Sequence, residues 1–164
     1  MRFANRLALI LFVLVACVGC DQTTKSIAQS YLPRSEVWSF LEDTVRLQLA
    51  YNNGAFLSLG SSLPEFWQHA LFSVCAGALL LGMFGYALFA KRIPPIGVFA
   101  IALFVAGGVS NLADRLAYGG YVIDFINLGI GPLRTGIFNV ADIFITAGAL
   151  VLFAHEFHRT RIDS

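Results

Sequence analysis

The chain has 164 residues, of which 57% are hydrophobic and only 13% are charged, and its formal net charge is +1. A soluble domain carries about 25% charged residues, so this composition excludes an ordinary soluble protein and indicates an integral membrane protein. The charge gives no sign of a nucleic-acid-binding protein. The three cysteines lie in apolar stretches, so we expect neither a disulfide framework nor a zinc site.

Four apolar segments approach the length of about 20 residues that a transmembrane helix needs. The sequence therefore predicts an all-α polytopic membrane protein, with a single membrane domain over residues 1–164. The expected spans are residues 7–28, 66–90, 96–115 and 136–156.

Residues 1–20 have the basic start and apolar stretch of a bacterial lipoprotein signal, with a lipobox-like sequence that ends at Cys17. Three further apolar spans follow, whereas a mature lipoprotein is normally a soluble domain. We therefore expect that neither Cys17 nor Cys20 is processed and that both pack between helices as small apolar residues.

The distribution of basic residues predicts the orientation, because Lys and Arg favour the cytoplasmic side of short loops. If the spans alternate, six basic residues fall on one side and five on the other. The six are Arg2, Arg6, Lys91, Arg92, Arg159 and Arg161. Because the loops on that side are short, we expect it to be cytoplasmic, together with both termini.

The two remaining connections, residues 29–65 and 116–135, are then extracytoplasmic. Residues 45–51 alternate apolar and polar side chains, which predicts a half-buried strand. Asn52 and Gly54 follow it as part of a turn signal. We expect a small extracytoplasmic β element with a loop or helix lid in these connections.

Asp124 and Asp142 are the most unusual residues of the chain, because large apolar residues flank both of them. Placing an ionised carboxylate in such surroundings costs free energy, because it loses its hydration, so both residues are expected to serve a function. Two carboxylates at one site can activate a water for hydrolysis. Asp124 lies in a glycine-rich connection, for which we expect either a short strand or a loop resting on the bundle. Closure of this flexible connection is expected to bring the two aspartates together.

Helical spacing places several other polar residues on shared faces at the outer ends of the spans. Asp21 and Lys25 are one turn apart. Spans three and four are joined by a short connection and are expected to pack antiparallel. Their outer ends would then gather Asn111, Arg115, Asp124, Asn139 and Asp142.

Each of these residues also has a simpler structural interpretation. Asp21 and Lys25 could form a plain ion pair at a helix end, and Asp114 is best interpreted as an interfacial anchor. Arg115 could anchor in the same way, or it could orient a carboxylate or a substrate carbonyl. The remaining interpretations are a turn for Asn52 and Gly54, and hydrogen bonds to helix backbone for Asn111 and Asn139.

Five short motifs cover most of the chain. They are Asp-Gln-Thr-Thr-Lys at 21–25, Asn-Asn-Gly-Ala-Phe at 52–56, Gly-Gly-Val-Ser-Asn-Leu-Ala-Asp-Arg at 107–115, Val-Ile-Asp-Phe at 122–125 and Phe-Asn-Val-Ala-Asp at 138–142. In sequence and order they resemble the motifs of lipoprotein signal peptidase (signal peptidase II), a family of bacterial membrane aspartyl peptidases. Phe56 and Ser110 depart from that family, which often has alanine and glycine there. We expect these departures to alter substrate shape or helix packing rather than the chemistry.

The resemblance implies a membrane aspartic endopeptidase. Such an enzyme removes the signal peptide from diacylglyceryl-modified prolipoproteins by cutting before the lipidated lipobox cysteine. It needs no metal and no cofactor. The implied residues are Asp124 and Asp142 as the catalytic pair, Asn52, Gly54, Asn111, Arg115 and Asn139 in substrate binding, and Asp21 and Lys25 in support of the site.

The resemblance further implies a location in the bacterial cytoplasmic (inner) membrane, with the active site at the outer, periplasmic face. The expected partners are diacylglyceryl-prolipoprotein substrates and membrane lipids, but no nucleic acid. We also expect a monomer that globomycin-type cyclic peptides inhibit.

The main alternative is a small proton-coupled transporter component, since buried aspartates relay protons. A transporter needs a continuous polar path across the membrane, whereas the polar residues cluster at the outer ends and the second span has almost none. A non-catalytic scaffold or an unusual lipoprotein would leave the paired aspartates without explanation.

Overall fold

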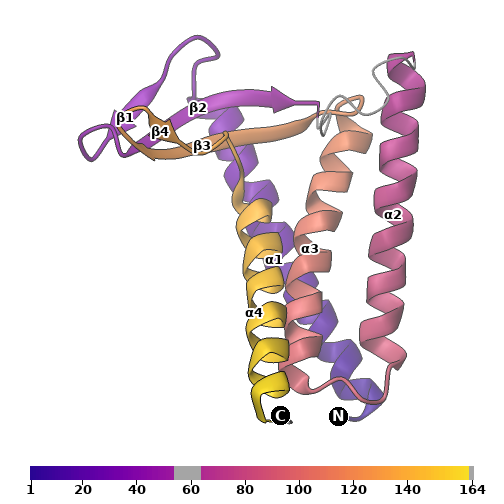
Figure 1. Cartoon of the computed structure of the whole chain (residues 1–164). Coiled ribbons are helices and arrows are strands. Elements are labelled where there is room, and N and C mark those ends of the chain that lie inside the picture. Colours follow the sequence, from indigo (N-terminus) through magenta and orange to yellow (C-terminus); the bar gives the residue numbers. More distant parts are fainter. Residues whose placement is uncertain (54–63, 163–164) are drawn as a thin grey trace.

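The computed structural model describes residues 1–53 and 64–162. Four long helices lie side by side, and a small sheet crosses one end of them (Figure 1). Both chain ends lie at the opposite end of the bundle. In chain order the elements are α1 (Phe3–Tyr31), β1 (Trp38–Phe40), β2 (Val45–Asn52), α2 (Glu65–Phe89), α3 (Pro95–Ala117), β3 (Val122–Ile130), β4 (Leu133–Arg134) and α4 (Val140–Ile162).

All four helices are long and apolar enough to cross a membrane, which confirms the predicted four-span membrane protein. Many large apolar side chains point away from the bundle, among them Phe12, Val15 and Leu81. A water-soluble protein rarely exposes contiguous apolar surface on this scale, whereas lipid tails accept it. The fourth helix begins at Val140, later than the expected span, because Asn139 caps its N-terminus.

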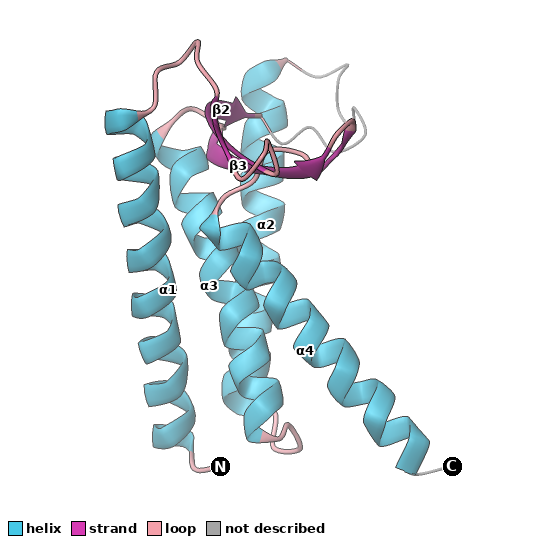
Figure 2. Ribbon diagram, turned by 90° about the vertical axis from the view of Figure 1, so that its left-hand side faces the viewer, coloured by secondary structure: helices cyan, strands magenta, loops and turns pink. Residues whose placement is uncertain are grey.

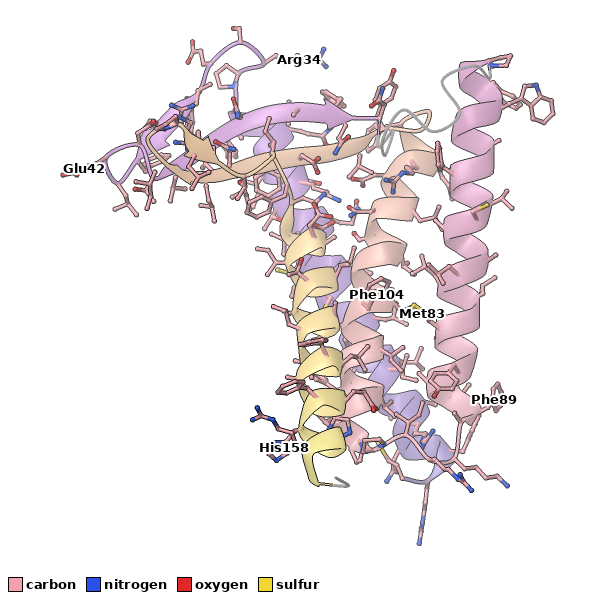
Figure 3. All side chains as sticks on the ribbon, viewed as in Figure 1. Arg34, Glu42, Met83, Phe89, Phe104 and His158 are labelled. Atoms are coloured by element: carbon pink, nitrogen blue, oxygen red, sulfur yellow. The ribbon has the colours of Figure 1, made fainter. Side chains whose placement is uncertain are left out.

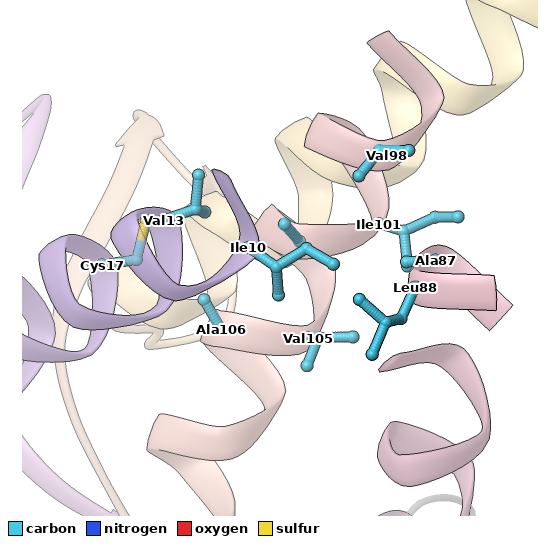
Figure 4. Packing of buried hydrophobic residues seen from close by; sticks show 10 residues of the cluster. Ile10, Val13, Cys17, Ala87, Leu88, Val98, Ile101, Val105 and Ala106 are labelled. Carbon is cyan, nitrogen blue, oxygen red and sulfur yellow. The ribbon is translucent and has the colours of Figure 1, made fainter. Parts of the chain in front are cut away.

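Helix α3 lies at the centre of the bundle and contributes half of the buried residues of its apolar core. The core joins one face of α1 to α2 and α3 (Figure 4). Its members are Ile10, Val13 and Cys17 of α1, Ala87 and Leu88 of α2, and Val98, Ile101, Ala102, Val105 and Ala106 of α3. The buried positions of α1 recur every three or four residues, which is the spacing of one helix face.

Helices α3 and α4 approach closely because glycines replace larger side chains where they cross. A Cβ atom at Gly107 of α3 would collide with the carbonyl oxygen of Ala141, in the first turn of α4. A Cβ atom at Gly148 of α4 would lie 2.5 Å from the carbonyl oxygen of Ala100 in α3. Small residues let transmembrane backbones pack in this way. Away from the sheet, α4 diverges from α1 (Figure 2).

At the end of the bundle that lies away from the sheet, Arg6 is buried rather than free in the interface. Its guanidinium donates hydrogen bonds to the carbonyl oxygens of Ala87 (3.2 Å) and Ile93 (3.0 Å) and to that of Ala90 (2.5 Å). These carbonyls lie at and beyond the end of α2, where helix carbonyls lack intrahelical partners. Arg6 therefore closes the turn between α2 and α3.

The sheet is antiparallel throughout, with strand order β1-β2-β3-β4. Strand β2 confirms the strand predicted for residues 45–51. The tip of the β1–β2 hairpin, which carries Glu42, lies far from the helices (Figure 3). The register of β2 and β3 pairs Asn52 with Val122 and Ala50 with Asp124. Asn52 and Asp124 are thus diagonal neighbours on one face of the sheet.

Of the two alternatives for the connection that carries Asp124, a short strand or a loop, the structure shows the strand, because Asp124 lies inside β3. The run of apolar residues around it pairs with β2, and the glycines of the connection lie near the ends of the strand. Asp124 is therefore held in a strand that pairs with β2. The expected lid falls partly on residues 54–63, which lie outside the described residues.

Candidate active site

Asp142 lies in the first turn of α4, where it forms a reciprocal cap with Asn139. The Asn139 side-chain oxygen accepts a hydrogen bond from the Asp142 backbone N–H (3.0 Å). In return, Asp142 Oδ2 accepts one from the Asn139 backbone N–H (3.1 Å). This is the geometry of a capping box, with Asn at the cap and Asp three residues later. The helix N-terminus also favours a negative charge at this position.

The other oxygen of Asp142 is fixed from α3. Asn111 Nδ2 donates to Asp142 Oδ1 (2.9 Å). The Asn111 side-chain oxygen in turn accepts hydrogen bonds from Lys25 Nζ (2.9 Å) and Asn139 Nδ2 (3.0 Å). An ammonium group can only donate, so Lys25 determines which end of the Asn111 amide faces Asp142. Both carboxylate oxygens of Asp142 are therefore oriented by the protein.

Asn139 also joins the two aspartates. Its side-chain nitrogen donates to Asp124 Oδ1 at 2.7 Å, while its oxygen caps Asp142 as described. Asn52 Nδ2 donates to the second oxygen of Asp124 (2.9 Å). The two aspartates thus come from a strand and a helix and share one asparagine between them. The predicted gathering of these residues at one end of the bundle is what the structure shows.

Asp124 is the more buried of the pair, with 1% of its surface exposed, whereas Asp142 is half-buried. Burial, together with the nearby charge of Asp142, raises the pKa of Asp124 to about 6. The hydrogen bonds from Asn52 and Asn139 act in the opposite direction. Asp124 therefore keeps a proton to a higher pH than an ordinary aspartate does.

Beneath the pair lies a buried network around Lys25. Lys25 Nζ forms ion pairs with Asp21 Oδ2 (2.7 Å) and Asp114 Oδ2 (2.8 Å), and all three side chains are almost fully buried. Asp21 Oδ1 accepts the backbone N–H of Ala141 (2.8 Å), and Asp114 Oδ2 accepts that of Ile123 (3.1 Å). The network therefore joins α1 to α3, α4 and β3.

This network corrects the interpretation of Asp114 as an interfacial anchor. Asp114 is 1% exposed and bridges Lys25 to the strand that carries Asp124. Asp21 and Lys25 are likewise not a plain ion pair at a helix end, since Lys25 has a second carboxylate partner. The spacing within each helix showed which residues share a face, but not that the two faces meet.

Ser110 and Gln22 belong to the same network, and sequence reasoning missed both of them as site residues. The fully buried Ser110 hydroxyl donates to Asp21 Oδ2 (2.7 Å). Gln22 Nε2 donates to Ser110 Oγ (3.0 Å) and to Asp114 Oδ1 (2.8 Å). The departure at Ser110 was expected to affect substrate shape or packing, whereas its hydroxyl binds a buried carboxylate. Its spacing of four residues from Asp114, which places both side chains on one face of the helix, was the available signal.

The structure places Arg115 beside the pair but without a direct ion pair to it. Arg115 Nη1 donates to the Asn111 carbonyl oxygen (3.3 Å), and the charges of Asp142 and Asp124 act on its guanidinium. Gly54 lies outside the described residues. Among the residues that the structure describes, no group of three or more His, Cys, Asp and Glu side chains could hold a metal ion.

An open apolar groove of about 490 Å³ begins at Asp142 and follows α4 toward the middle of the span. From Asp142 onward the lining residues recur at helical spacing and form one face of α4, and Phe138 lies just before that helix. They are Phe138, Asp142, Ile143, Thr146, Ala147 and Leu150. Asp142 is thus the charged end of an otherwise almost entirely apolar groove.

The sequence model of the family described as "Signal peptidase (SPase) II" matches residues 13–158 of this chain. The chain belongs to the signal peptidase II family. It is therefore a peptidase, and its four spans make it a multi-pass membrane protein. The predicted family is confirmed.

Individual relatives agree with this assignment. The lipoprotein signal peptidase of Francisella tularensis subsp. novicida (strain U112) is 34% identical over 148 residues, which cover 88% of each chain. That of Sinorhizobium fredii (strain NBRC 101917 / NGR234) is 33% identical over 162 residues, or 97% of this chain and 92% of the relative. A bacterial membrane enzyme solved in meso at 2.3 Å has the same fold, with a TM-score of 0.76 and 22% identity over 98% of this chain and 92% of the other.

Proposed function

We propose that this member of the signal peptidase II family is an aspartic endopeptidase that removes signal peptides from diacylglyceryl-modified prolipoproteins. The observation that carries the proposal is the pair Asp124 and Asp142, joined through Asn139 at the end of the bundle. The activity named for its relatives, lipoprotein signal peptidase, supports the substrate class. We further propose that the cut falls before the lipidated cysteine.

The surroundings of the two aspartates differ in burial and in hydrogen bonding. The charge of Asp142 is stabilised by two N–H donors and by the N-terminus of α4. Asp124 is nearly fully buried, and its pKa is raised to about 6. Two neighbouring carboxylates tend to share one proton. We therefore assign the general base to Asp142 and the general acid to Asp124.

The chemistry then needs only water and the two carboxyl groups. Asp142 takes a proton from a water whose oxygen attacks the scissile carbonyl carbon, while Asp124 gives its proton to the carbonyl oxygen. The resulting gem-diol collapses when Asp142 passes its proton to the leaving nitrogen and a hydroxyl proton returns to Asp124. The C–N bond breaks, and both aspartates regain their starting states.

The groove beside Asp142 supports a membrane-embedded substrate. Its apolar wall runs from Asp142 to Leu150 within a spanning helix. An apolar segment of substrate that lies along this wall would present its end to Asp142 at the edge of the membrane. A soluble peptide would gain little from such a surface, because its lining is almost entirely apolar.

We place the sheet and the aspartate pair on the outer, periplasmic face of the bacterial inner membrane. The charge bias of the short loops supports this orientation, as does the position of both chain ends at the opposite end of the bundle (Figure 1). A monomeric state, contacts with membrane lipids and inhibition by globomycin-type cyclic peptides stay predictions.

The apolar interior of the bundle argues against the alternative of a proton-coupled transporter. Between Arg6 and Asp21, the buried face of α1 consists of Ile10, Val13 and Cys17, and these pack into the apolar core. A proton path would need polar groups at this depth.

The test is cleavage of a diacylglyceryl-modified prolipoprotein by the purified full chain in lipid. Asp124→Asn and Asp142→Asn should each lower kcat by about 10²–10⁴-fold, because each removes an acid or base group from the reaction. Asp43→Asn is a matched control in the turn between β1 and β2, since Asp43 pairs with Arg46 and Arg134 and contacts no site residue named above. The pair is not catalytic if either site variant is folded and keeps near-normal turnover.

A further inference from the structure

We propose that Ser110 is a positioning residue for Asp142, acting through the buried carboxylate of Asp21. Ser110 is fully buried, and its hydroxyl donates to Asp21 Oδ2 at 2.7 Å. Gln22 Nε2 donates to the Ser110 oxygen at 3.0 Å, which directs the hydroxyl proton toward Asp21. This inference rests on the proposed function, since it concerns the alignment of the proposed base.

Two chains of contacts connect Ser110 with Asp142. In the first, Asp21 holds the first turn of α4, because its Oδ1 accepts the Ala141 backbone N–H at 2.8 Å. Ala141 immediately precedes Asp142. A carboxylate that accepts the Ser110 hydroxyl on one oxygen cannot rotate freely, so its other oxygen stays aimed at Ala141.

The second chain passes through Lys25. The Lys25 ammonium shares Asp21 Oδ2 with the Ser110 hydroxyl and also donates to Asn111, which in turn donates to Asp142. Without the hydroxyl, Asp21 has one donor fewer and attracts Lys25 more strongly. The bond from Lys25 to Asn111 would weaken, and the amide that orients Asp142 would lose its anchor.

The principal test compares Ser110→Ala with Ser110→Gly in the full chain reconstituted in lipid. Alanine removes the hydroxyl and fills its place with a methyl group. Glycine leaves room for a water, which would find Asp21 and Gln22 as partners. Positioning predicts that the alanine variant loses about 10-fold in kcat with KM nearly unchanged, and that the glycine variant loses less.

A purely structural role predicts the opposite order, because alanine is much the better helix former. Ser30→Ala is the matched control, since the exposed Ser30 hydroxyl only bonds its own helix, at the Ser26 carbonyl oxygen. It should behave as the unmodified chain. The proposal fails if Ser110→Ala keeps its kcat, if it changes KM alone, or if Ser110→Gly is the less active of the two.

A second measurement needs no substrate. Hydrogen exchange at the Ala141 amide should be faster in Ser110→Ala than in the unmodified chain, because Asp21 no longer holds that N–H as firmly. Unchanged exchange would overturn the proposal even if the chain proved not to cleave prolipoproteins. If the alanine variant does not fold, Ser110→Cys replaces the hydroxyl by a weak donor of similar size. It should show the same changes in smaller measure, and normal kcat and exchange would again overturn the proposal.

Discussion

At the scale of single residues, Asn139 explains how two carboxylates from different elements come to be aligned. Its oxygen must face the Asp142 N–H to cap α4, so its nitrogen is turned toward Asp124. A glutamine would place its amide one methylene farther away, and an aspartate would offer no donor to Asp124. The same side chain thus caps the start of α4 and links the two proposed catalytic groups.

The assignment of acid and base predicts the pH dependence of cleavage. Asp124 must carry a proton to act as the acid, and its pKa is raised to about 6. The value of kcat/KM, which reports on the free enzyme, should therefore fall as the pH rises above about 6. The pH profile of kcat, which reports on the enzyme with bound substrate, should begin to fall at a higher pH. Bound substrate removes further water from Asp124 and so raises its pKa further. If kcat/KM instead rises between pH 5 and pH 7, the assignment must be reversed, with Asp124 as the base and Asp142 as the acid.

The same raised pKa predicts a pH-dependent effect of Asp124→Asn on stability. The folded chain binds this proton more tightly than the unfolded chain, so ionisation of Asp124 costs folded-state stability as the pH rises from 3.8 to about 6. Asparagine does not titrate. The melting temperature of the variant relative to the unmodified chain should therefore rise by about 5 °C between pH 4.5 and pH 7.5.

The control for this effect is Asp43→Asn. The hydrogen bond from Arg46 holds the pKa of Asp43 below its usual range, so Asp43 is ionised in the folded chain at both pH values. Its melting difference from the unmodified chain should stay almost constant. A constant difference for Asp124→Asn as well would mean that Asp124 does not have a raised pKa.

Residue-level predictions from sequence were strongest where a charge stood in apolar surroundings. Asp124 and Asp142 stood out because nothing else explained their cost, and the structure brings them together through Asn139. Asp114 was misinterpreted because an Asp-Arg pair at a helix end is typical of an interface. Its partner, Lys25, lies on another helix, and spacing within one helix carries no information about partners on another.

At the scale of elements, the close crossing of α3 and α4 fixes Asn111 beside Asp142. Gly148→Ala should weaken this crossing, because the new Cβ would lie 2.5 Å from the Ala100 carbonyl oxygen and 2.9 Å from the Phe104 nitrogen. Backbone atoms cannot turn aside as a side chain can, so the helices must separate. We expect a loss of about 1–3 kcal/mol in the free energy of unfolding, measured by denaturation in detergent.

Gly85→Ala is the matched control for this crossing. A Cβ atom at Gly85 of α2 meets nothing within 4 Å, so only helix propensity changes. This variant should be neutral or more stable by up to about 1 kcal/mol. Equal effects of the two substitutions would show that the spacing between α3 and α4 does not depend on Gly148.

The helices were predictable as elements because each one is a long apolar run, and β2 because its side chains alternate. Strands β1 and β4 were not expected, since three and two residues carry no usable periodicity. For the segment of β3 the sequence favoured neither a strand nor a loop, because glycines near its ends suggest a flexible connection. Its register with β2, which sets Asn52 beside Asp124, depends on tertiary contacts that no local pattern records.

At the scale of the whole molecule, the polar residues divide into two ends separated by an apolar middle. At one end, Arg6 closes the turn after α2. At the other, Lys25 is paired with Asp21 and Asp114 beneath the aspartate pair. A buried charge left without its partner costs several kcal/mol, so the network fixes the position of α1 relative to α3 along the helix axes. This position in turn places the two aspartates where the spanning helices end.

This division predicts which residues are reached from outside the cell membrane. Glu42 lies at the tip of the sheet and His158 near the end of α4, at opposite ends of the molecule (Figure 3). In a chain whose Cys17, Cys20 and Cys75 are replaced by alanine, Glu42→Cys should react with a membrane-impermeant maleimide on intact spheroplasts. His158→Cys should react only after the membrane is opened, since the short basic loops hold that end in the cytoplasm.

Cleavage activity retained by both variants would show that the fold is intact. Labelling of His158→Cys alone before lysis would place the aspartate pair on the cytoplasmic face and remove its access to exported prolipoproteins.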